Sequence, residues 1–276
     1  MLSSNEIKAV FIGDIAFNTD ITPLRTQTSI GGAAYYSAVG AISASRLAHT
    51  RPTVGVVAPV GGDFDMGYLL DKNIDMQGVP VINSGKTCWF TLTQHEDNTR
   101  EFTAERFVAG SVNTKIFPQS YSHARYIHLS TSLPQNYIAW MEFLSGKTNA
   151  TISADAFEAF ALQFPQESIR ALNMSDLIFI NEAEANILEN HGTIRTDVPW
   201  IFKKGPGGAS YIYGAKEINV RAKKVDAIET TGAGDVLAGA FLALLSNGFE
   251  TEQALTTAVD IASLSVTQFG VEHLTR

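Results

Sequence analysis

The stretch from Glu229 to Phe241, ETTGAGDVLAGAF, places one carboxylate between a turn of small residues and an apolar run. After Gly234 the apolar residues recur at helical spacing, which predicts a buried helix ending near Gly248. The first amides of such a helix lack intrahelical partners and carry partial positive charge, and small residues let a ligand approach them closely. Gly232, Ala233 and Gly234 are therefore a candidate anion hole for a phosphoryl group.

The acid of this stretch, Asp235, has two interpretations. An Asp in the first turn of a helix stabilises it by roughly 0.3–1 kcal/mol through the helix dipole alone. Alternatively, it is a general base that takes a proton from a substrate hydroxyl while the neighbouring amides hold the transferred phosphate. We expect the carboxyl to stay ionised among positive amides, so its placement matters more than its basicity. The loop lacks both the GK[ST] of a Walker A motif and the GxGxxG spacing of dinucleotide sites.

Composition bounds the class of protein. The length of 276 residues is within the range of a single large α/β unit, and a composition of 45% hydrophobic and 17% charged residues allows a sizeable core. A formal net charge of −8 argues against a nucleic-acid partner but not against a small anionic ligand. The single cysteine, Cys88, cannot form an intramolecular disulfide. No apolar run reaches the roughly 18 residues that span a bilayer, and MLSSNEIKAVFIGDIAF is unlike a signal peptide. We therefore expect a cytoplasmic enzyme with a small-molecule substrate and no membrane partner.

Short apolar runs alternate with helical stretches along the chain. Strands are predicted at residues 9–13, 53–61, 125–130, 151–155, 177–181 and 200–205, and a glycine turn opens a predicted helix over 31–48. Continuous apolar strands are typical of a parallel sheet covered by helices on both faces, which is a three-layer α/β domain. In such sheets ligands bind beyond the carboxyl ends of the strands. The loops of interest are at residues 13–14 and 130–133, from 155 onward, from 181 onward, and at 205–208.

Two stretches interrupt this alternation. Residues Thr87 to Glu105 hold two β-type runs around a polar DN turn, which predicts a hairpin, and residues Phe17 to Thr28 are also extended. The pattern fits a small sheet that projects from the main domain and an ordinary edge hairpin equally well.

The stretch ETTGAGDVLAGAF resembles the C-terminal signature DTTGAGDxFxGAF of ribokinase-like, or phosphofructokinase-B-type, carbohydrate kinases, with Glu229 in place of the leading Asp. Gly31-Gly32, VGGDFDMG (60–67), NEAE (181–184) and KKGPGG (203–208) are similar to further motifs of that family, in the same order. The resemblance covers nearly the whole chain. It implies a single domain over residues 1–276, with three α/β/α layers around a mostly parallel sheet, and a β-sheet lid built from about 16–30 and 84–108.

The resemblance also implies an activity, which is ATP-dependent phosphoryl transfer that requires magnesium, with Asp235 as the base. It assigns Asn181 and Glu184 to the placement of magnesium and phosphates, with Glu184 acting directly or through water. The alternative for these two residues is a helix N-cap followed by first-turn acids. The nucleotide site implied by the family motifs comprises Lys204, Gly205, Gly208 and Thr231. Use of a monovalent cation is left open.

The departures from the family pattern fall on the substrate side. Asn18, with Asp20 close by, stands where the family often has a hydroxyl-binding Asp; the alternative is a turn residue entering the lid. Tyr36 replaces the Asn of GGxxxN, although it could be a core aromatic. The register of the lid places Phe90 where a small residue usually faces the ligand. The candidate substrate-binding residues are Asn18, Asp20, Gly31, Gly32, Tyr36 and Phe90.

We therefore expect a kinase that transfers the γ-phosphoryl group of ATP to an alcohol of a small sugar or sugar-like substrate. The bulky residues weaken the case for ribose or fructose 6-phosphate, so a nucleoside or cyclitol kinase is the alternative within the family. A non-catalytic ligand-binding relative is the alternative from another class, but a pure binder has no need of Asp235. A dinucleotide-binding oxidoreductase is disfavoured because GDIAFN after the first strand lacks GxGxxG. A homodimer through the edge of the lid is a further expectation.

Overall fold

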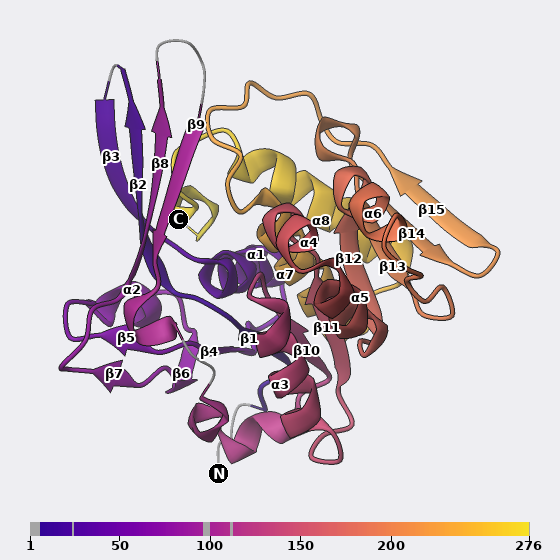
Figure 1. Ribbon diagram of the computed structural model, residues 1–276, viewed down its shortest axis with the longest axis horizontal. Helices are drawn as coiled ribbons and strands as arrows, with labels where there is room; N and C mark the ends of the chain where they lie inside the picture. Colours follow the sequence, from indigo (N-terminus) through magenta and orange to yellow (C-terminus); the bar gives the residue numbers. More distant parts are fainter. Residues whose placement is uncertain (1–5, 24, 96–99, 111–112, 276) are drawn as a thin grey trace.

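A computed structural model describes residues 6–23, 25–95, 100–110 and 113–275. Its largest element is a nine-stranded sheet (Figure 1). In sheet order the strands are β15 (Lys216–Val220), β14 (Ala209–Tyr213), β13 (Trp200–Lys203), β12 (Leu177–Asn181), β11 (Thr151–Asp155), β10 (Tyr126–Leu129), β1 (Ala9–Ile12), β4 (Val54–Val57) and β6 (Asp75–Gly78). Neighbouring strands from β13 to β6 run parallel, and β14 and β15 are antiparallel additions. The prediction of a mostly parallel sheet is confirmed.

The predicted strand over residues 53–61 is wrong in its length. The chain leaves the large sheet after Val57, and Val60–Gly61 forms a separate strand, β5, that pairs with β7 (Val81–Ile82). Pro59 stands between the two strands and has no N–H to donate to a ladder, which explains why pairing stops there.

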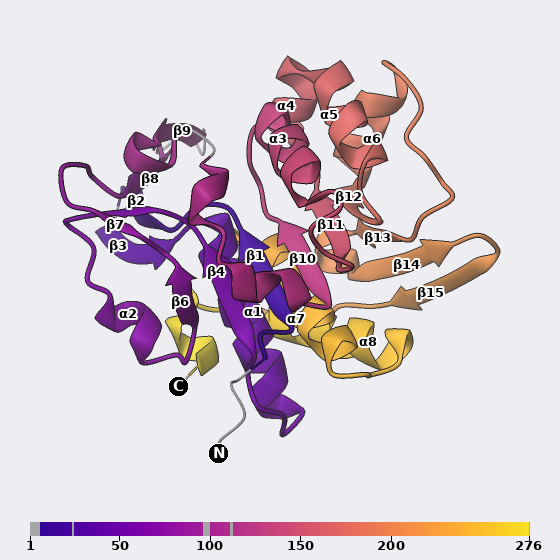
Figure 2. The same cartoon turned by 90° about the horizontal axis from the view of Figure 1, so that it is seen from below.

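Helices cover both faces of the large sheet (Figure 2). One face carries α1 (Ala33–Leu47), α7 (Ala233–Ser246) and α8 (Thr251–Ser265); the other carries α3 (Pro134–Leu144), α4 (Glu158–Gln163), α5 (Pro165–Asn173) and α6 (Glu182–Glu189). Side chains of β1 alternate between the two cores, since Phe11 packs on the α1 and α7 side and Val10 on the α3 side. The three-layer prediction is confirmed. The remaining helical segments are short: α2 (Gly67–Leu70) and single turns at Phe107–Ala109, Thr114–Ile116, Gln119–His123, Gly205–Gly207 and Glu272–Thr275.

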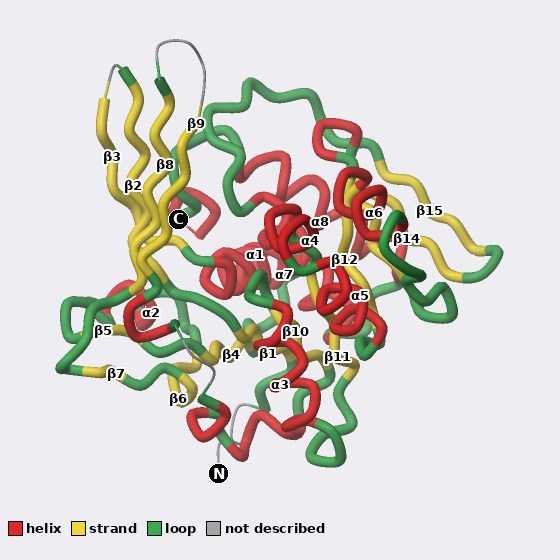
Figure 3. The backbone as a smooth tube through the Cα atoms, in the orientation of Figure 1, coloured by secondary structure: helices red, strands yellow, loops and turns green. Residues whose placement is uncertain are grey.

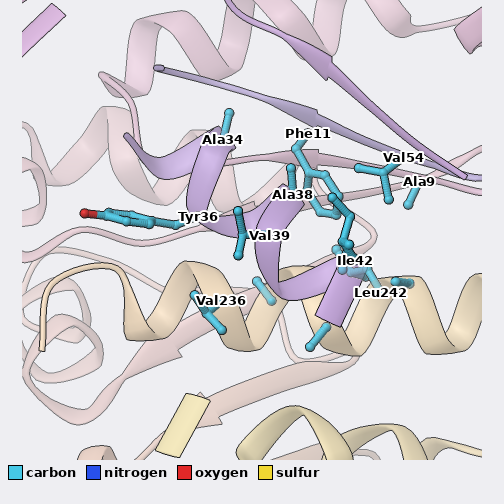
Figure 4. Close-up of a cluster of buried hydrophobic side chains, with 14 of the residues drawn as sticks. Ala9, Phe11, Ala34, Tyr36, Ala38, Val39, Ile42, Val54, Val236 and Leu242 are labelled. Atoms are coloured by element: carbon cyan, nitrogen blue, oxygen red, sulfur yellow. The ribbon is translucent and has the colours of Figure 1, made fainter. Parts of the chain in front are cut away.

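Helices α1 and α7 approach each other unusually closely (Figure 4). A Cβ on Gly239 would lie 1.8 Å from the carbonyl oxygen of Ser37, and a Cβ on Gly40 would lie 2.3 Å from that of Val236. Only glycine fits at either position, because the clash would be with backbone. The two glycines therefore hold the N-terminal halves of α1 and α7 against each other.

Four strands form a separate sheet that projects from the main body as a lid (Figure 3). They are β3 (Arg25–Gly31), β2 (Ala16–Thr22), β8 (Cys88–Gln94) and β9 (Arg100–Glu105), in that order. Strands β8 and β9 pair antiparallel, so the hairpin is confirmed, although its predicted DN turn lies outside the described residues. The parallel pairing of β2 with β8 makes this a sheet of its own rather than an edge hairpin, and it places Asn18 beside Phe90. The homodimer through the lid stays a prediction.

The base of the lid is tied to the VGGDFDMG stretch by Thr87, which is fully buried. Asp63 Oδ1 accepts hydrogen bonds from the amide of Thr87 at 2.9 Å and from its hydroxyl at 2.7 Å. The same hydroxyl accepts from the Gly61 amide at 2.9 Å. One threonine thus binds the exposed Asp63 carboxylate and satisfies the buried Gly61 amide at the point where β8 leaves the main body.

Candidate active site

A pocket of about 380 Å³ is lined by the lid, by the carboxyl ends of the large sheet and by the start of α7. It contains ten of the residues singled out from the sequence: Asn18, Asp20, Gly32, Tyr36, Phe90, Glu184, Thr231, Gly232, Gly234 and Asp235. Six others do not line it: Gly31, Ala233, Asn181, Lys204, Gly205 and Gly208. The first and last of these ten residues are more than two hundred positions apart in sequence, so the fold brings together most of the predicted site.

The GAG turn begins α7 as predicted. Gly232 is the N-cap residue in the left-handed region, with φ of 78°, and its carbonyl accepts from the Val236 amide at 2.9 Å. The Ala233 amide already donates to the Thr230 carbonyl at 3.3 Å, while Gly234 lines the pocket. Asp235 in the first turn also lines the pocket, and its Oδ1 atom is buried without a hydrogen-bond partner among the described residues. A buried acceptor without a partner is costly, which suits a site that a substrate hydroxyl fills.

The environment of Asp235 differs from the sequence expectation. Burial, and then the negative charge of Asp155, raise the pKa of the Asp235 carboxyl well above its usual range, and Lys203 opposes the rise. The expectation of a fully ionised, weakly basic Asp considered only the helix amides. A second buried carboxylate nearby could not be seen from the local sequence, and its charge makes the Asp235 carboxyl hold its proton more tightly.

A buried ion cluster forms the floor of the pocket. The Lys203 ammonium pairs with Asp155 Oδ1, and it lies 3.8 Å from Glu184 Oε2. Burial raises the pKa of Glu184 to about 7, although Lys203 opposes the rise. Burial alone would lower the pKa of Lys203, but the carboxylates of Asp155 and Glu184 outweigh it and hold the ammonium charged. Neither Asp155 nor Lys203 was among the residues selected from the sequence, although Asp155 is the last residue of β11, where one of the loops of interest begins.

Asn181 and Glu184 form a reciprocal capping box at the start of α6. The Glu184 amide donates to Asn181 Oδ1 at 2.9 Å, and the Asn181 amide donates to Glu184 Oε2 at 2.8 Å. Their observed contacts are therefore those of a helix N-cap, which was the alternative to a role in placing magnesium. Glu184 also reaches the pocket, whereas Asn181 does not line it.

The donor set fits a weakly held magnesium ion. Among the described residues no group of three or more His, Cys, Asp or Glu side chains could hold a metal ion. Magnesium keeps several waters and usually takes one or two carboxylates plus the phosphates of a nucleotide, so the single carboxylate of Glu184 is sufficient.

The predicted nucleotide-site residues of KKGPGG lie in the turn between β13 and β14. Lys204 is exposed and donates to Asn219 Oδ1 at 2.8 Å. Gly205 is exposed as well, and a Cβ on Gly208 would lie 2.0 Å from the Val220 carbonyl oxygen. Within the KKGPGG motif, Lys203 is the residue that lines the pocket.

On the lid side, Asn18 and Tyr36 form a hydrogen-bonded pair. Asn18 Nδ2 donates to the Tyr36 hydroxyl at 2.6 Å, and Asn18 Oδ1 is buried without a partner in the described part of the chain. Gly31 lies under this pair, because a Cβ there would be 2.4 Å from the Asn18 amide group. Figure 4 shows the Tyr36 hydroxyl directed away from the apolar core, so Tyr36 is not simply a core aromatic.

Two pocket residues missed in the sequence form an ion pair between the lid and the main body. Arg106 Nη1, one residue beyond β9, donates to Asp14 Oδ2 at 2.8 Å. Burial raises the pKa of Asp14 to about 6, and Arg106 opposes the rise. Asp14 is two residues beyond the end of β1 and stands in a loop of interest. Arg106 carries no local signal, because only the β8–β9 pairing brings it here.

The outer part of the pocket is aromatic. Phe90 and Phe102 of the lid have ring centroids 5.8 Å apart, and Phe157 faces the pocket from the loop after β11. Phe102 is 57% exposed and Phe157 38% exposed, so apolar rings stand open to solvent at the mouth. Such exposed rings favour a ligand with a planar or apolar part.

Comparisons with known proteins agree with this geometry. The family model described as pfkB family carbohydrate kinase matches residues 7–275. The cytidine kinase of Thermococcus kodakarensis is 24% identical over 274 residues, which cover 95% of this chain and 96% of that protein. The structure of the Burkholderia thailandensis nucleoside kinase in complex with inosine has a TM-score of 0.80 at 16% identity, covering 97% of this chain and 94% of that chain.

A further structure, from E. coli, is provisionally assigned as ribokinase II and holds ATP and Mg²⁺. It has a TM-score of 0.78 at 20% identity, covering 98% of this chain and 96% of that chain. The predicted ribokinase-like fold with a β-sheet lid is confirmed, and the lid has four strands. Among the described residues no helix has the length and apolar character that a membrane span requires.

Proposed function

Because the chain belongs to the pfkB family of carbohydrate kinases, we propose that it transfers the γ-phosphoryl group of ATP to an alcohol of a small polyhydroxylated substrate. The observation that carries this proposal is the position of Asp235. Its Oδ1 atom is buried without a partner among the described residues, in a pocket that it shares with Gly232 and Gly234. An acceptor for a hydroxyl proton and a candidate phosphoryl site thus stand side by side.

In the proposed mechanism Asp235 takes the proton of the substrate hydroxyl as that oxygen attacks the γ-phosphorus atom in line with the departing ADP. The amides at the start of α7 stabilise the charge on the equatorial oxygens of the transferred group. Glu184 would hold a nucleotide-bound magnesium ion, which supplies neutralisation of the phosphate oxygens. The lid covers the pocket, and the ion pair between Arg106 and Asp14 holds it against the main body, which limits access of water.

The pocket residues that would contact the phosphoryl acceptor support a second candidate function, in which the acceptor is a nucleoside. Asn18 Oδ1 and the Tyr36 hydroxyl offer a hydrogen-bond acceptor and donor to sugar hydroxyls, deep in the pocket. The rings of Phe90, Phe102 and Phe157 at the mouth would have little to contact in a bare pentose, but they suit a stacked base. The names of the Thermococcus and Burkholderia relatives agree with this reading.

A panel of sugars, cyclitols and nucleosides, assayed with ATP and magnesium by ADP release, tests the proposal. We expect turnover with at least one acceptor and its loss in Asp235→Asn. A Phe90→Ala variant separates the candidates, because it should raise KM for nucleosides about tenfold and leave KM for a free sugar nearly unchanged. Measurable affinity for an acceptor without phosphoryl transfer to any compound would favour a non-catalytic ligand-binding protein instead.

A further inference from the structure

We propose that Lys203 is a catalytic residue whose ammonium group contacts the phosphoryl group during its transfer at the start of α7. The inference rests on the proposed function and names one more group in the same site. It concerns a lysine that the sequence pattern gave no reason to prefer over its neighbour Lys204.

The position of Lys203 is determined by the sheet. It is the last residue of β13 and stands beside Asn181, the last residue of β12. Its side chain is 16% exposed, pairs with Asp155, and lies within 3.8 Å of Glu184. At the same time it lines the pocket.

The start of α7 lies on another side of the same ammonium group. A Cβ placed on Gly234 would be 3.5 Å from Lys203 Cδ and 3.7 Å from Nζ. Because Gly234 has no side chain, nothing of its own stands between its backbone and Lys203. An oxygen atom that accepts from an amide of this first turn would therefore be within reach of the ammonium.

The hydrogen-bonding capacity of the lysine supports this assignment. An ammonium group has three donors, and the contacts with Asp155 and Glu184 use at most two of them. The third can donate to a phosphoryl oxygen without breaking the ion cluster. The two carboxylates keep the lysine in its ammonium form, and they fix its position before substrate binds.

The charges of the site also favour a cation here. Asp155, Glu184 and Asp235 all line the pocket, and the Lys203 ammonium pairs with Asp155 and lies 3.8 Å from Glu184. As transfer proceeds, the bond from the acceptor oxygen to phosphorus forms and the bond from the bridging oxygen of ADP breaks. The hydroxyl proton goes to Asp235, and Lys203 keeps its three protons throughout. Its fixed charge stabilises the equatorial oxygens when their charge is greatest.

The test must separate contact with the phosphoryl group from neutralisation of Asp155. Lys203→Met alone leaves Asp155 unpaired and can fail to fold. The informative comparison is therefore Asp155→Asn against the double variant Asp155→Asn/Lys203→Met, because both lack an unpaired Asp155 charge. Lys223→Met, which removes an exposed lysine paired with Asp260 at 2.7 Å, serves as the control for loss of a positive charge.

Two readouts are measured on each variant. The first is kcat with the best acceptor. The second is the Kd of ADP in the presence of magnesium and aluminium fluoride, compared with its Kd in the presence of magnesium alone. The fluoroaluminate stands in for the phosphoryl group during transfer. Relative to Asp155→Asn, we expect the double variant to lose about 100-fold in kcat and a similar factor in affinity for ADP–fluoroaluminate. Affinity for ADP alone should change by less than about threefold.

Equal values for the two variants would overturn the inference, since they would show that Lys203 only neutralises Asp155. If Asp155→Asn itself has no turnover, the test rests on the Kd of ADP–fluoroaluminate and the Kd of ADP, compared between the two variants. A wild-type protein that phosphorylates no acceptor defeats the proposed function first, whereas an active wild type with equal variants defeats only the role of Lys203.

Discussion

The ring of Tyr36 lies against the backbone of Gly232, so that a Cβ added to the glycine would be 2.2 Å from Cδ2 of the ring. Tyr36 also accepts the hydrogen bond from Asn18. One side chain thus connects the lid strand β2 with the turn that begins α7. The close approach of α1 and α7 at Gly40 and Gly239 holds both partners of this contact in place.

Gly232→Ala tests this contact. The substitution should lower turnover by about 100-fold, because the new methyl group must displace either the Tyr36 ring or the anion-hole backbone. It also strains a left-handed position, which by itself costs roughly 1–2 kcal/mol of stability. Gly248→Ala is a matched control, since Gly248 has φ of 86° but no atom within 4 Å of an added Cβ. Unfolding by denaturant and kcat would be measured for both. Equal losses in the two variants would show that Tyr36 does not constrain the turn.

Asp235→Asn tests the base. The amide has the same size and keeps a hydrogen-bonding oxygen, but it cannot take a proton, so turnover should fall by about 10²–10⁴-fold. The melting temperature and the Kd of ATP should stay close to wild type, as they should for Asp260→Asn, which alters an acid outside the pocket. Turnover within about threefold of wild type on the true acceptor would remove Asp235 from the mechanism.

Thr87→Val tests the tie at the base of the lid. The valine has nearly the same shape but leaves the Gly61 amide and Asp63 without the hydroxyl, which should cost about 1–3 kcal/mol of unfolding free energy. A looser lid should also raise the KM for the acceptor. Thr87→Ser keeps the hydroxyl and should retain most of the stability. The tie is unimportant if valine and serine behave alike in both measurements.

The local parts of this structure could be predicted from the sequence. The strands at residues 9–13, 125–130, 151–155 and 177–181 are apolar runs with clear limits, and the GAG turn before Asp235 has features of its own. Asn18, Tyr36 and Phe90 were found because family motifs mark their positions. Each of these depends on a few neighbouring residues.

The parts that depend on distant partners could not be predicted. Arg106 reaches Asp14 because β9 pairs with β8, and the sequence near residue 106 gives no sign of a contact with Asp14. Lys203 and Lys204 look alike in sequence, yet only the first points into the pocket, since successive side chains at the end of a strand face opposite ways. The raised pKa of Asp235 depends on Asp155, which is eighty residues away.

The ion pair between Asp14 and Arg106 predicts a pH dependence of stability. Burial raises the pKa of Asp14 to about 6 in the folded protein, whereas an unfolded Asp titrates near 3.9. Between these values the folded state binds the proton more tightly. The stability contributed by this carboxyl is therefore fully present below the unfolded pKa and is lost as the pH rises through about 6.

Asp14→Asn removes this titration but leaves a hydrogen-bonding oxygen for Arg106. Relative to wild type, the variant should therefore gain on the order of 2 kcal/mol of unfolding free energy between pH 4 and pH 7.5. Denaturant unfolding at several pH values measures the difference, and groups common to both proteins cancel. Asp260→Asn, which alters an acid outside the pocket, gives the baseline. A constant difference between Asp14→Asn and wild type across this range would mean that Asp14 titrates alike in the folded and unfolded states, and that Arg106 offsets its burial completely.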